Sequence, residues 1–191
     1  GRQDPPTLES QTFEYSRLLA RFQGKRVIAR VLDLDDDKPL PFLLAAGEGV
    51  YANRGLQILL ANRDVLITQL EALAKAASYY PKTDLWVMAP MVINADEAEE
   101  FVSLARAAGH SQVGVMVEVP ELAEAETLAR ITAAVDFYSI GTNDLTNYVL
   151  KTDRQSGQAS LADARRPEVL EIIEAVVNSA QNKGIPVGVC G

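Results

Sequence analysis

Five short apolar segments alternate with segments of helical periodicity along this chain, which predicts an α/β fold built on a parallel sheet. Each apolar segment is nearly continuous rather than alternating with polar residues, as expected for strands that are covered on both faces. Polar side chains follow directly after several of these segments, among them Asp33, Glu118 and Asn143. The pattern alone does not distinguish an open, doubly wound sheet from a closed (β/α)8 barrel. In a barrel these polar residues would all surround one mouth, where chemistry is expected.

The predicted elements follow one another in a regular order after a polar start at residues 1–9. A helix is expected first, because Phe13, Leu18 and Phe22 recur at helical spacing before Gly24. The predicted strands are residues 26–34, 85–91, 113–118, 137–140 and 187–190. The predicted helices are residues 11–22, 54–77, 95–108, 120–133 and 167–183, with a further helix opening at Thr142 and a long loop at 35–52. Pro120 is well placed in the first turn of its helix.

Composition limits the classes of protein to which the chain can belong. With 191 residues, 48% of them hydrophobic, it is one domain or a piece of a larger one, with a sizeable core. No apolar run reaches the roughly 18 residues of a membrane span, so membrane insertion is not expected. The net charge of −8 argues against a nucleic-acid-binding surface, which needs clustered Lys and Arg. A single cysteine excludes an internal disulfide framework and fits a reducing cytoplasm.

The segment 136–148 (DFYSIGTNDLTNY) carries the strongest functional signal. An apolar strand runs into Gly141, and Asn143 and Asp144 then open a helix. An amide and a carboxylate thereby lie beside the free N–H groups of a helix start, which suits a phosphate together with a divalent cation. The alternative is an Asx-type cap that only starts the helix. A second carboxylate, Glu118, ends the apolar strand of segment 113–120 (VGVMVEVP), and this favours metal binding.

These two segments resemble the phosphoenolpyruvate (PEP)-binding barrel of the PEP-utilising enzymes. Segments 28–34 with 37–41, 148–154 and 187–191 point further to the enzyme I branch of the bacterial sugar phosphotransferase system, rather than to pyruvate phosphate dikinase or PEP synthase. The resemblance covers about residues 27–191 and implies a (β/α)8 TIM-type barrel, here a partial barrel with about five of eight strands. It also implies that residues 1–191 are a fragment of a larger enzyme, whose phosphohistidine domain is absent from this chain.

The resemblance implies the activity of a Mg²⁺-dependent PEP-protein phosphotransferase. Such an enzyme transfers the PEP phosphoryl group to a histidine of its own N-terminal domain and releases pyruvate, and the histidine then serves a small phosphocarrier protein. A homodimer formed through the barrel domain and a cytoplasmic location are implied as well. Two alternatives stay open: a degenerate, non-catalytic regulatory or dimerisation domain of the same fold, and a relative of PEP synthase or pyruvate phosphate dikinase.

The resemblance also implies the site residues, position by position. The implied substrate-binding residues are Arg30, Arg54, Asn143 and Arg154, the implied Mg²⁺ ligands are Glu118 and Asp144, and the implied catalytic proton donor to C3 of the enolpyruvate is Cys190. Without the resemblance, Arg54 and Arg154 would be interpreted as surface residues and Cys190 as a small buried one. Arg30 is unusual by itself, because a charge within an apolar strand needs a partner.

Several residues depart from the family pattern or invite a different assignment. Asp35 and Asp36 stand where the family has glycines, and Gln57 stands where it has a second arginine. Added negative charge near an anion site weakens anion binding, so these departures favour the non-catalytic alternative. His110 is the only histidine, and its segment is typical of a surface turn. It is not expected to accept the phosphoryl group, because the family's acceptor lies in a separate domain.

Overall fold

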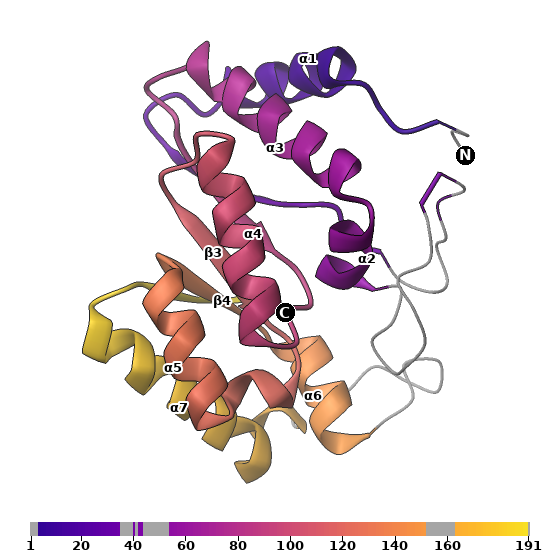
Figure 1. Cartoon of the computed structure of the whole chain (residues 1–191). Coiled ribbons are helices and arrows are strands. Elements are labelled where there is room, and N and C mark those ends of the chain that lie inside the picture. The colour runs from indigo at the N-terminus through magenta and orange to yellow at the C-terminus, as the bar shows by residue number, and fades with distance from the viewer. Residues whose placement is uncertain (1–3, 35–39, 41, 44–53, 152–162, 191) are drawn as a thin grey trace.

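The computed structural model shows a curled half-barrel of five parallel strands with helices packed against its outer face (Figure 1). It describes residues 4–34, 40, 42–43, 54–151 and 163–190. The strands are β1 (Arg26–Arg30), β2 (Asp84–Ala89), β3 (Val113–Val117), β4 (Phe137–Gly141) and β5 (Val187–Cys190). Each strand pairs with its successor in the chain, in the order β1-β2-β3-β4-β5. Consecutive strands of a (β/α)8 barrel have this order, whereas a doubly wound sheet reverses it, so the predicted partial barrel is confirmed.

The helices lie side by side across the sheet (Figure 1). They are α1 (Leu8–Leu19), α2 (Gly55–Ala61), α3 (Arg63–Ser78), α4 (Ala95–Ala107), α5 (Ala125–Ala134), α6 (Thr142–Leu150) and α7 (Pro167–Lys183), with short 3-10 helices η1 (Pro120–Ala123) and η2 (Asp163–Arg165). Helix α1 packs on α3, and α5 contacts both α4 and α7. In the part of the chain that the structure describes, no helix combines the length and apolar character that a bilayer crossing requires.

Side chains of the strands alternate between the helix-covered face and a concave face. Val87, Val115 and Ile140 are fully buried under the helices and belong to the main core. Trp86 and Phe137 occupy the alternate positions and point to the concave face, where their ring centroids lie 4.8 Å apart. Successive positions on this face form layers along the half-barrel, and polar residues gather in the layer at the carboxyl ends of the strands.

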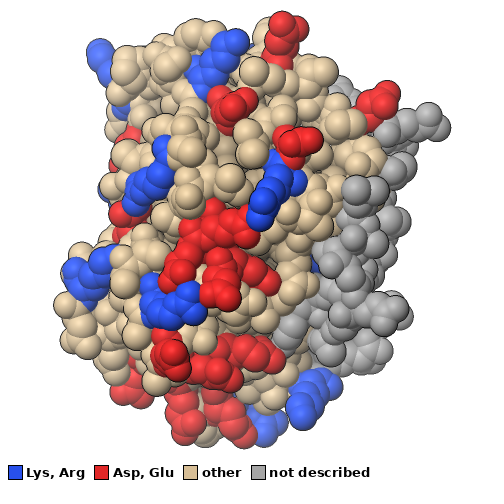
Figure 2. All heavy atoms as spheres, viewed as in Figure 1, with Lys and Arg blue, Asp and Glu red and all other residues tan. Residues whose placement is uncertain are grey.

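Acidic side chains gather on the helix-covered surface of the molecule (Figure 2). Asp96 and Glu99 of α4 both pair with Arg130 of α5, at N–O distances of 2.6 and 2.8 Å. Much of the excess negative charge therefore lies on the outer, helical surface. Arg30, in contrast, lies at the carboxyl end of β1 on the concave face, because it alternates with Ala29, which packs against the main core.

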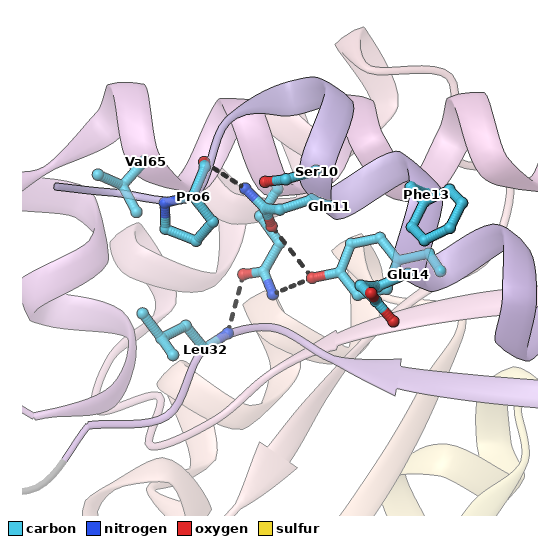
Figure 3. A pocket seen from close by; sticks show the side chains of 9 residues that line it. Pro6, Ser10, Gln11, Phe13, Glu14, Leu32 and Val65 are labelled. Carbon is cyan, nitrogen blue, oxygen red and sulfur yellow. Dashed lines mark hydrogen bonds between the residues drawn. The ribbon is translucent and has the colours of Figure 1, made fainter. Parts of the chain in front are cut away.

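Strand β1 ends at Arg30 and not at position 34 as predicted. The Val31 N–H still donates to the Met88 carbonyl oxygen at 3.0 Å, and the Leu32 N–H, on the side of the chain away from β2, donates to Gln69 Oε1 of α3 at 2.9 Å. Gln69 Nε2 in turn donates to the Tyr15 hydroxyl at 3.0 Å, and this hydroxyl donates to Gln11 Oε1 at 3.1 Å. Figure 3 shows this chain of hydrogen bonds between Leu32 and Gln11. The backbone thus leaves the sheet and is tied to α1 and α3.

The single helix predicted over residues 54–77 is two helices, α2 and α3, separated at Asn62. Asn62 has φ −122° and ψ 56°, outside the helical region. Its side-chain amide donates to Ile58 O at 2.8 Å, and its carbonyl accepts from the Leu66 N–H at 3.3 Å. Asn62 therefore ends one helix and starts the next, since short polar side chains that bond to nearby backbone compete with helical hydrogen bonds.

Two other helix starts differ from the predicted ones. Helix α1 begins at Leu8 rather than at position 11, because the Thr7 side chain accepts a hydrogen bond from the Ser10 N–H at 3.2 Å and so caps the helix. The helix predicted from Pro120 begins as the 3-10 turn η1, and Glu124 with ψ 134° separates it from α5.

Candidate functional site

The carboxyl ends of the strands bring the predicted site residues to one edge of the sheet. Arg30 ends β1, Glu118 follows β3 directly, and Cys190 ends β5. In the register of β4 and β5, Cys190 lies opposite Gly141, and α6 begins at the next residue, so Asn143 and Asp144 lie in the first turn of that helix. These positions therefore surround one mouth of the half-barrel.

Glu118 is the most deeply buried ionisable residue of this edge, with 2% of its surface exposed. Its Oε2 atom accepts a hydrogen bond from the Met91 N–H at 2.8 Å. Burial, together with the nearby Asp144 and Asp33 carboxylates, raises the pKa of the Glu118 carboxyl to about 7. The Met91 N–H and the Arg30 guanidinium act in the opposite direction. Charges from three elements thus converge on one buried carboxylate.

Met91 and Gly141 confine this carboxylate from two sides. Met91 has φ 46°, a left-handed conformation that is uncommon for a residue with a side chain. A Cβ atom on Gly141 would lie 2.7 Å from Glu118 Cγ and 2.8 Å from Glu118 Oε1, so only glycine leaves the carboxylate its place. The role of the Met91 N–H as a hydrogen-bond donor to Glu118 could not be predicted, because the sequence does not show that this methionine has a left-handed backbone conformation.

Arg30 pairs with a nearby carboxylate, as a charged residue in an apolar strand requires. Its Nη1 atom lies 2.8 Å from Asp33 Oδ2, and the two side chains are 43% and 28% exposed. A partly exposed pair of this kind adds little to stability. The exposure leaves the Arg30 guanidinium accessible from the mouth, where its charge also acts on Glu118.

Arg54 lies at the start of α2 and donates a hydrogen bond from Nη1 to the Tyr148 hydroxyl at 2.7 Å. Tyr148 belongs to α6, the helix that carries Asn143 and Asp144 in its first turn. Asp144 and Tyr148 are four residues apart and so share one face of the helix. The contact therefore places Arg54 beside the face of α6 that holds Asp144. Tyr148 lies in the segments that carry the family resemblance, but the sequence predicts no role for it.

The start of α6 is not closed by an Asx-type cap. Its N-cap residue is Gly141, and no side chain caps it. Asn143 is exposed and Asp144 half-buried within the first turn. The alternative in which Asn143 only caps a helix is therefore wrong, and the first N–H groups of α6 are not satisfied by a capping side chain.

Cys190 is not the buried core residue that its type alone would suggest. It is exposed, and its Sγ atom lies 3.5 Å from Ser139 Oγ and 3.5 Å from the Ile140 carbonyl oxygen. Its own carbonyl oxygen accepts a hydrogen bond from Thr142 Oγ1 at 3.3 Å. The thiol thus contacts β4, the Cys190 carbonyl contacts the start of α6, and the residue lies opposite Gly141 and hence near Glu118.

Some predicted features lie outside the described residues or have no counterpart among them. Arg154, Asp35 and Asp36 fall in segments that the structure does not describe. Within the described ranges, no group of three or more His, Cys, Asp or Glu side chains is arranged to hold a metal ion. Glu118 and Asp144 are two carboxylates whose charges repel each other, and Mg²⁺ commonly takes one or two protein carboxylates, with substrate phosphate and water as its other ligands. This donor pair fits such an ion.

His110 does not lie on the surface as predicted. It is only 6% exposed, and its Nε2 atom lies 2.9 Å from the Leu70 carbonyl oxygen. Burial lowers the pKa of the His110 imidazole, and the charge of Arg106 lowers it further. A buried, hydrogen-bonded imidazole at the amino-terminal end of β3 is remote from the mouth, which agrees with its exclusion as a phosphoryl acceptor.

A separate pocket of about 300 Å³ lies beside α1 (Figure 3). Its lining includes Pro6, Phe13, Leu32 and Val65, and none of the predicted site residues. Because the polar groups that line it, such as Gln11, already bond to one another or to backbone, it offers no convergent set of groups to a ligand.

Comparison with known proteins agrees with the geometry of this edge. The family described as "PEP-utilising enzyme, PEP-binding domain" matches residues 1–191. The chain belongs to the family of PEP-utilising enzymes. The phosphoenolpyruvate-protein phosphotransferase of Streptomyces coelicolor is 42% identical to it over an alignment of 191 positions that covers 97% of this chain and 34% of that protein.

Two further relatives of the PEP-utilising family carry the same name. The phosphoenolpyruvate-protein phosphotransferase of Haloferax volcanii is 38% identical over 205 residues, and that of Priestia megaterium is 36% identical over 206 residues. Both alignments cover 100% of this chain and 36% and 35% of the respective proteins. The chain thus spans about a third of the length of the curated relatives that it matches.

Proposed function

We propose that this chain is the PEP-binding part of a PEP-protein phosphotransferase of the enzyme I type. The observation that carries the proposal is the convergence of Arg30, Glu118 and Asp144 at the carboxyl edge of the half-barrel, in a chain of the PEP-utilising family. The relatives named phosphoenolpyruvate-protein phosphotransferase support it. The whole reaction transfers the phosphoryl group of PEP to a histidine of another domain and releases pyruvate.

Substrate binding falls to the arginines and to the start of α6. Arg30 and Arg54 approach the mouth from two elements, and a guanidinium binds phosphate oxygens in pairs. The exposed Asn143 side chain lies beside uncapped N–H groups of α6, which together suit a phosphate. Arg154 completes the proposed set as a contact to the carboxylate or phosphate of PEP.

Glu118 and Asp144 are the proposed ligands of Mg²⁺. Their carboxylate oxygens are the hard donors that this ion prefers. When bound, the ion would neutralise phosphate charge and orient the transferred group. Burial and the nearby Asp144 and Asp33 carboxylates raise the pKa of the Glu118 carboxyl, and a bound divalent cation would favour its ionised form.

The chemistry that remains for the protein is positioning and one proton transfer. The bond between phosphorus and the enol oxygen of PEP breaks as the acceptor histidine nitrogen bonds to phosphorus, and the arginines hold the transferred group in line. The enolate of pyruvate that leaves takes a proton at C3 from the Cys190 Sγ–H, and the resulting thiolate is reprotonated from solvent. Cys190 suits this role because its thiol is exposed at the mouth.

The partners follow from the same proposal. They are PEP and pyruvate, a phosphohistidine domain of the same enzyme, and through it a small phosphocarrier protein. A homodimer formed through this barrel domain and a cytoplasmic location are part of the proposal. The non-catalytic alternative rests on Asp35, Asp36 and Gln57. Gln57 stands where the family has an arginine, and it hydrogen-bonds to the Glu97 side chain.

Calorimetric titration of the intact protein with PEP, in the presence and absence of Mg²⁺, tests the proposal. PEP should bind with an affinity that Mg²⁺ increases, and Arg54→Ala should weaken binding at least tenfold. Arg63→Ala is the matched control, because Arg63 lies at the start of α3 and pairs with Glu100, so it should leave PEP binding unchanged. Absence of PEP binding by the folded protein in the presence of Mg²⁺ would establish the non-catalytic alternative.

A further inference from the structure

A strained backbone residue holds the buried carboxylate of the site. Met91 follows the end of β2 with φ 46°, a conformation that an L-residue with a Cβ adopts at a cost. In this conformation its N–H donates to Glu118 Oε2 at 2.8 Å. Strain of this kind persists only where the surroundings enforce it, and it is concentrated at functional sites.

The surroundings that enforce it come from the start of α2. A Cβ atom on Gly55 would lie 2.2 Å from Met91 Cβ and 3.1 Å from the Pro90 carbonyl oxygen. Gly55 also has a positive φ, of 43°, so its position is restricted to glycine on two grounds. Gly55 directly follows Arg54, the proposed phosphate-binding arginine. The close contact between Gly55 and Met91 therefore couples the position of Met91 to that of Arg54.

The opposite side of the carboxylate is restricted in the same way. Gly141 lies at the end of β4, and its Cα faces Glu118 so closely that an added Cβ would lie 2.8 Å from Oε1. Gly141 has φ −88°, which any residue adopts, so glycine is required there for space and not for backbone conformation. The carboxylate is thus fixed between an N–H donor and a bare Cα.

We propose that Met91, through its backbone N–H, and Gly55 and Gly141, through the space they leave, are positioning residues that fix the Glu118 carboxylate for metal binding. This inference rests on the proposed function, because the role of Glu118 as a metal ligand belongs to that proposal. None of the three residues is a proposed metal ligand, so their effect would be exerted through the orientation of Glu118. Residues that orient metal ligands commonly change metal affinity about 10- to 100-fold.

Binding of Mn²⁺ alone to the intact protein, followed by electron paramagnetic resonance of the free ion, is the test. Gly141→Ala and Gly55→Ala should each weaken Mn²⁺ binding about tenfold or more. The double variant Gly55→Ala/Met91→Gly removes the clash between the two Cβ atoms and should recover most of the lost affinity. A double variant that binds no better than Gly55→Ala would overturn the role of Met91.

Gly24→Ala and Gly184→Ala are the matched controls. Both glycines have positive φ angles, of 77° and 74°, but an added Cβ meets nothing within 4 Å, so they reproduce the backbone strain without the clash. Both controls should bind Mn²⁺ as the wild type does. If Gly55→Ala fails to fold, Gly141→Ala decides alone, since its backbone conformation suits alanine.

Two negative results are distinguishable. Wild-type Mn²⁺ affinity in folded Gly141→Ala and Gly55→Ala would overturn the positioning proposal and leave the proposed function intact. A wild-type protein that binds no Mn²⁺, with or without PEP, would overturn the metal assignment itself, and with it the positioning proposal.

Discussion

Replacement of Glu118 by glutamine should stabilise this protein at alkaline pH while it removes a proposed metal ligand. Glutamine has nearly the same shape and keeps an oxygen that can accept the Met91 N–H hydrogen bond. It removes the charge that burial and two neighbouring carboxylates disfavour. The substitution therefore measures the free-energy cost of burying the Glu118 charge while the shape of the site stays nearly the same.

The magnitude follows from the raised pKa of Glu118. Burial and the nearby carboxylates raise this pKa from 4.5 to about 7. At about 1.4 kcal/mol for each tenfold change in the ionisation constant, ionisation of Glu118 costs the folded state about 3 kcal/mol more than the unfolded state. Between pH 4.5 and about 7 the folded state binds more protons, so wild-type stability falls as pH rises through this window. Glu118→Gln has no such pH-dependent loss of stability. If the glutamine NH2 group lacks a good hydrogen-bond partner, the gain in unfolding free energy of the variant over the wild type would be smaller by about 1 kcal/mol.

Urea unfolding at pH 5 and pH 8, followed by circular dichroism, measures the effect. Glu118→Gln should exceed the wild type in free energy of unfolding by about 1 to 3 kcal/mol at pH 8, and by little or nothing at pH 5. Glu174→Gln on the exposed surface of α7 changes the net charge equally and should show no such pH-dependent difference. An equal difference between Glu118→Gln and wild type at both pH values would refute the reasoning.

Three further predictions concern other parts of the molecule. Lys183→Met should lower the free energy of unfolding, measured in urea, by about 1 to 3 kcal/mol. The reason is that Lys183 Nζ donates hydrogen bonds to the carbonyls of Thr132, Ala133 and Val135 at the end of α5. Glu171→Gln on the exposed surface of α7 is the control and should change the free energy of unfolding little. The His110 imidazole signal in the NMR spectrum should titrate with a pKa below the ordinary 6.5 of histidine, because burial lowers the pKa of His110. Stability should fall as the pH falls from 6.5 towards that lowered pKa, and titration at 6.5 or above would contradict this. Tyr148→Phe should raise the KM for PEP more than it lowers kcat, because it frees the Arg54 guanidinium from its hydrogen bond, and an unchanged KM would exclude this orienting role.

The strand pattern could be predicted from the sequence because burial on both faces leaves a continuous apolar run. The strands β3 and β4 are buried at every position, and both lie where the sequence predicts them. The end of β1 could not be predicted, because the apolar run continues past Arg30 to Leu34 and does not show that the Leu32 N–H bonds to Gln69 of α3. The break at Asn62 is also hidden, since a helical pattern of apolar residues continues on both sides of it.

The edge of the sheet that holds the candidate site could be predicted for the same physical reason, since polar residues directly after parallel strands share one edge. The placement of Glu118, Asp144 and Cys190 near that mouth agrees with the pattern, while their roles stay predictions. The hydrogen-bond partners of the site residues could not be predicted. Arg54 and Tyr148, which form a hydrogen bond, are 94 positions apart in the sequence. The Met91 N–H reaches Glu118 only because Met91 has a left-handed backbone conformation, which is not expected for a methionine.

The distribution of strain argues for a functional edge independently of any family resemblance. On the outer face the requirements of folding are met: Lys183 caps α5, Asn94 caps α4, and the core valines are fully buried. At the carboxyl edge they are not, because a carboxylate is buried beside other carboxylates and a methionine is held in a left-handed conformation. Each of these features costs stability, and replacing Glu118 or Met91 by simpler residues would remove that cost. The costly features that occur together at this edge agree with its proposed role as a binding site.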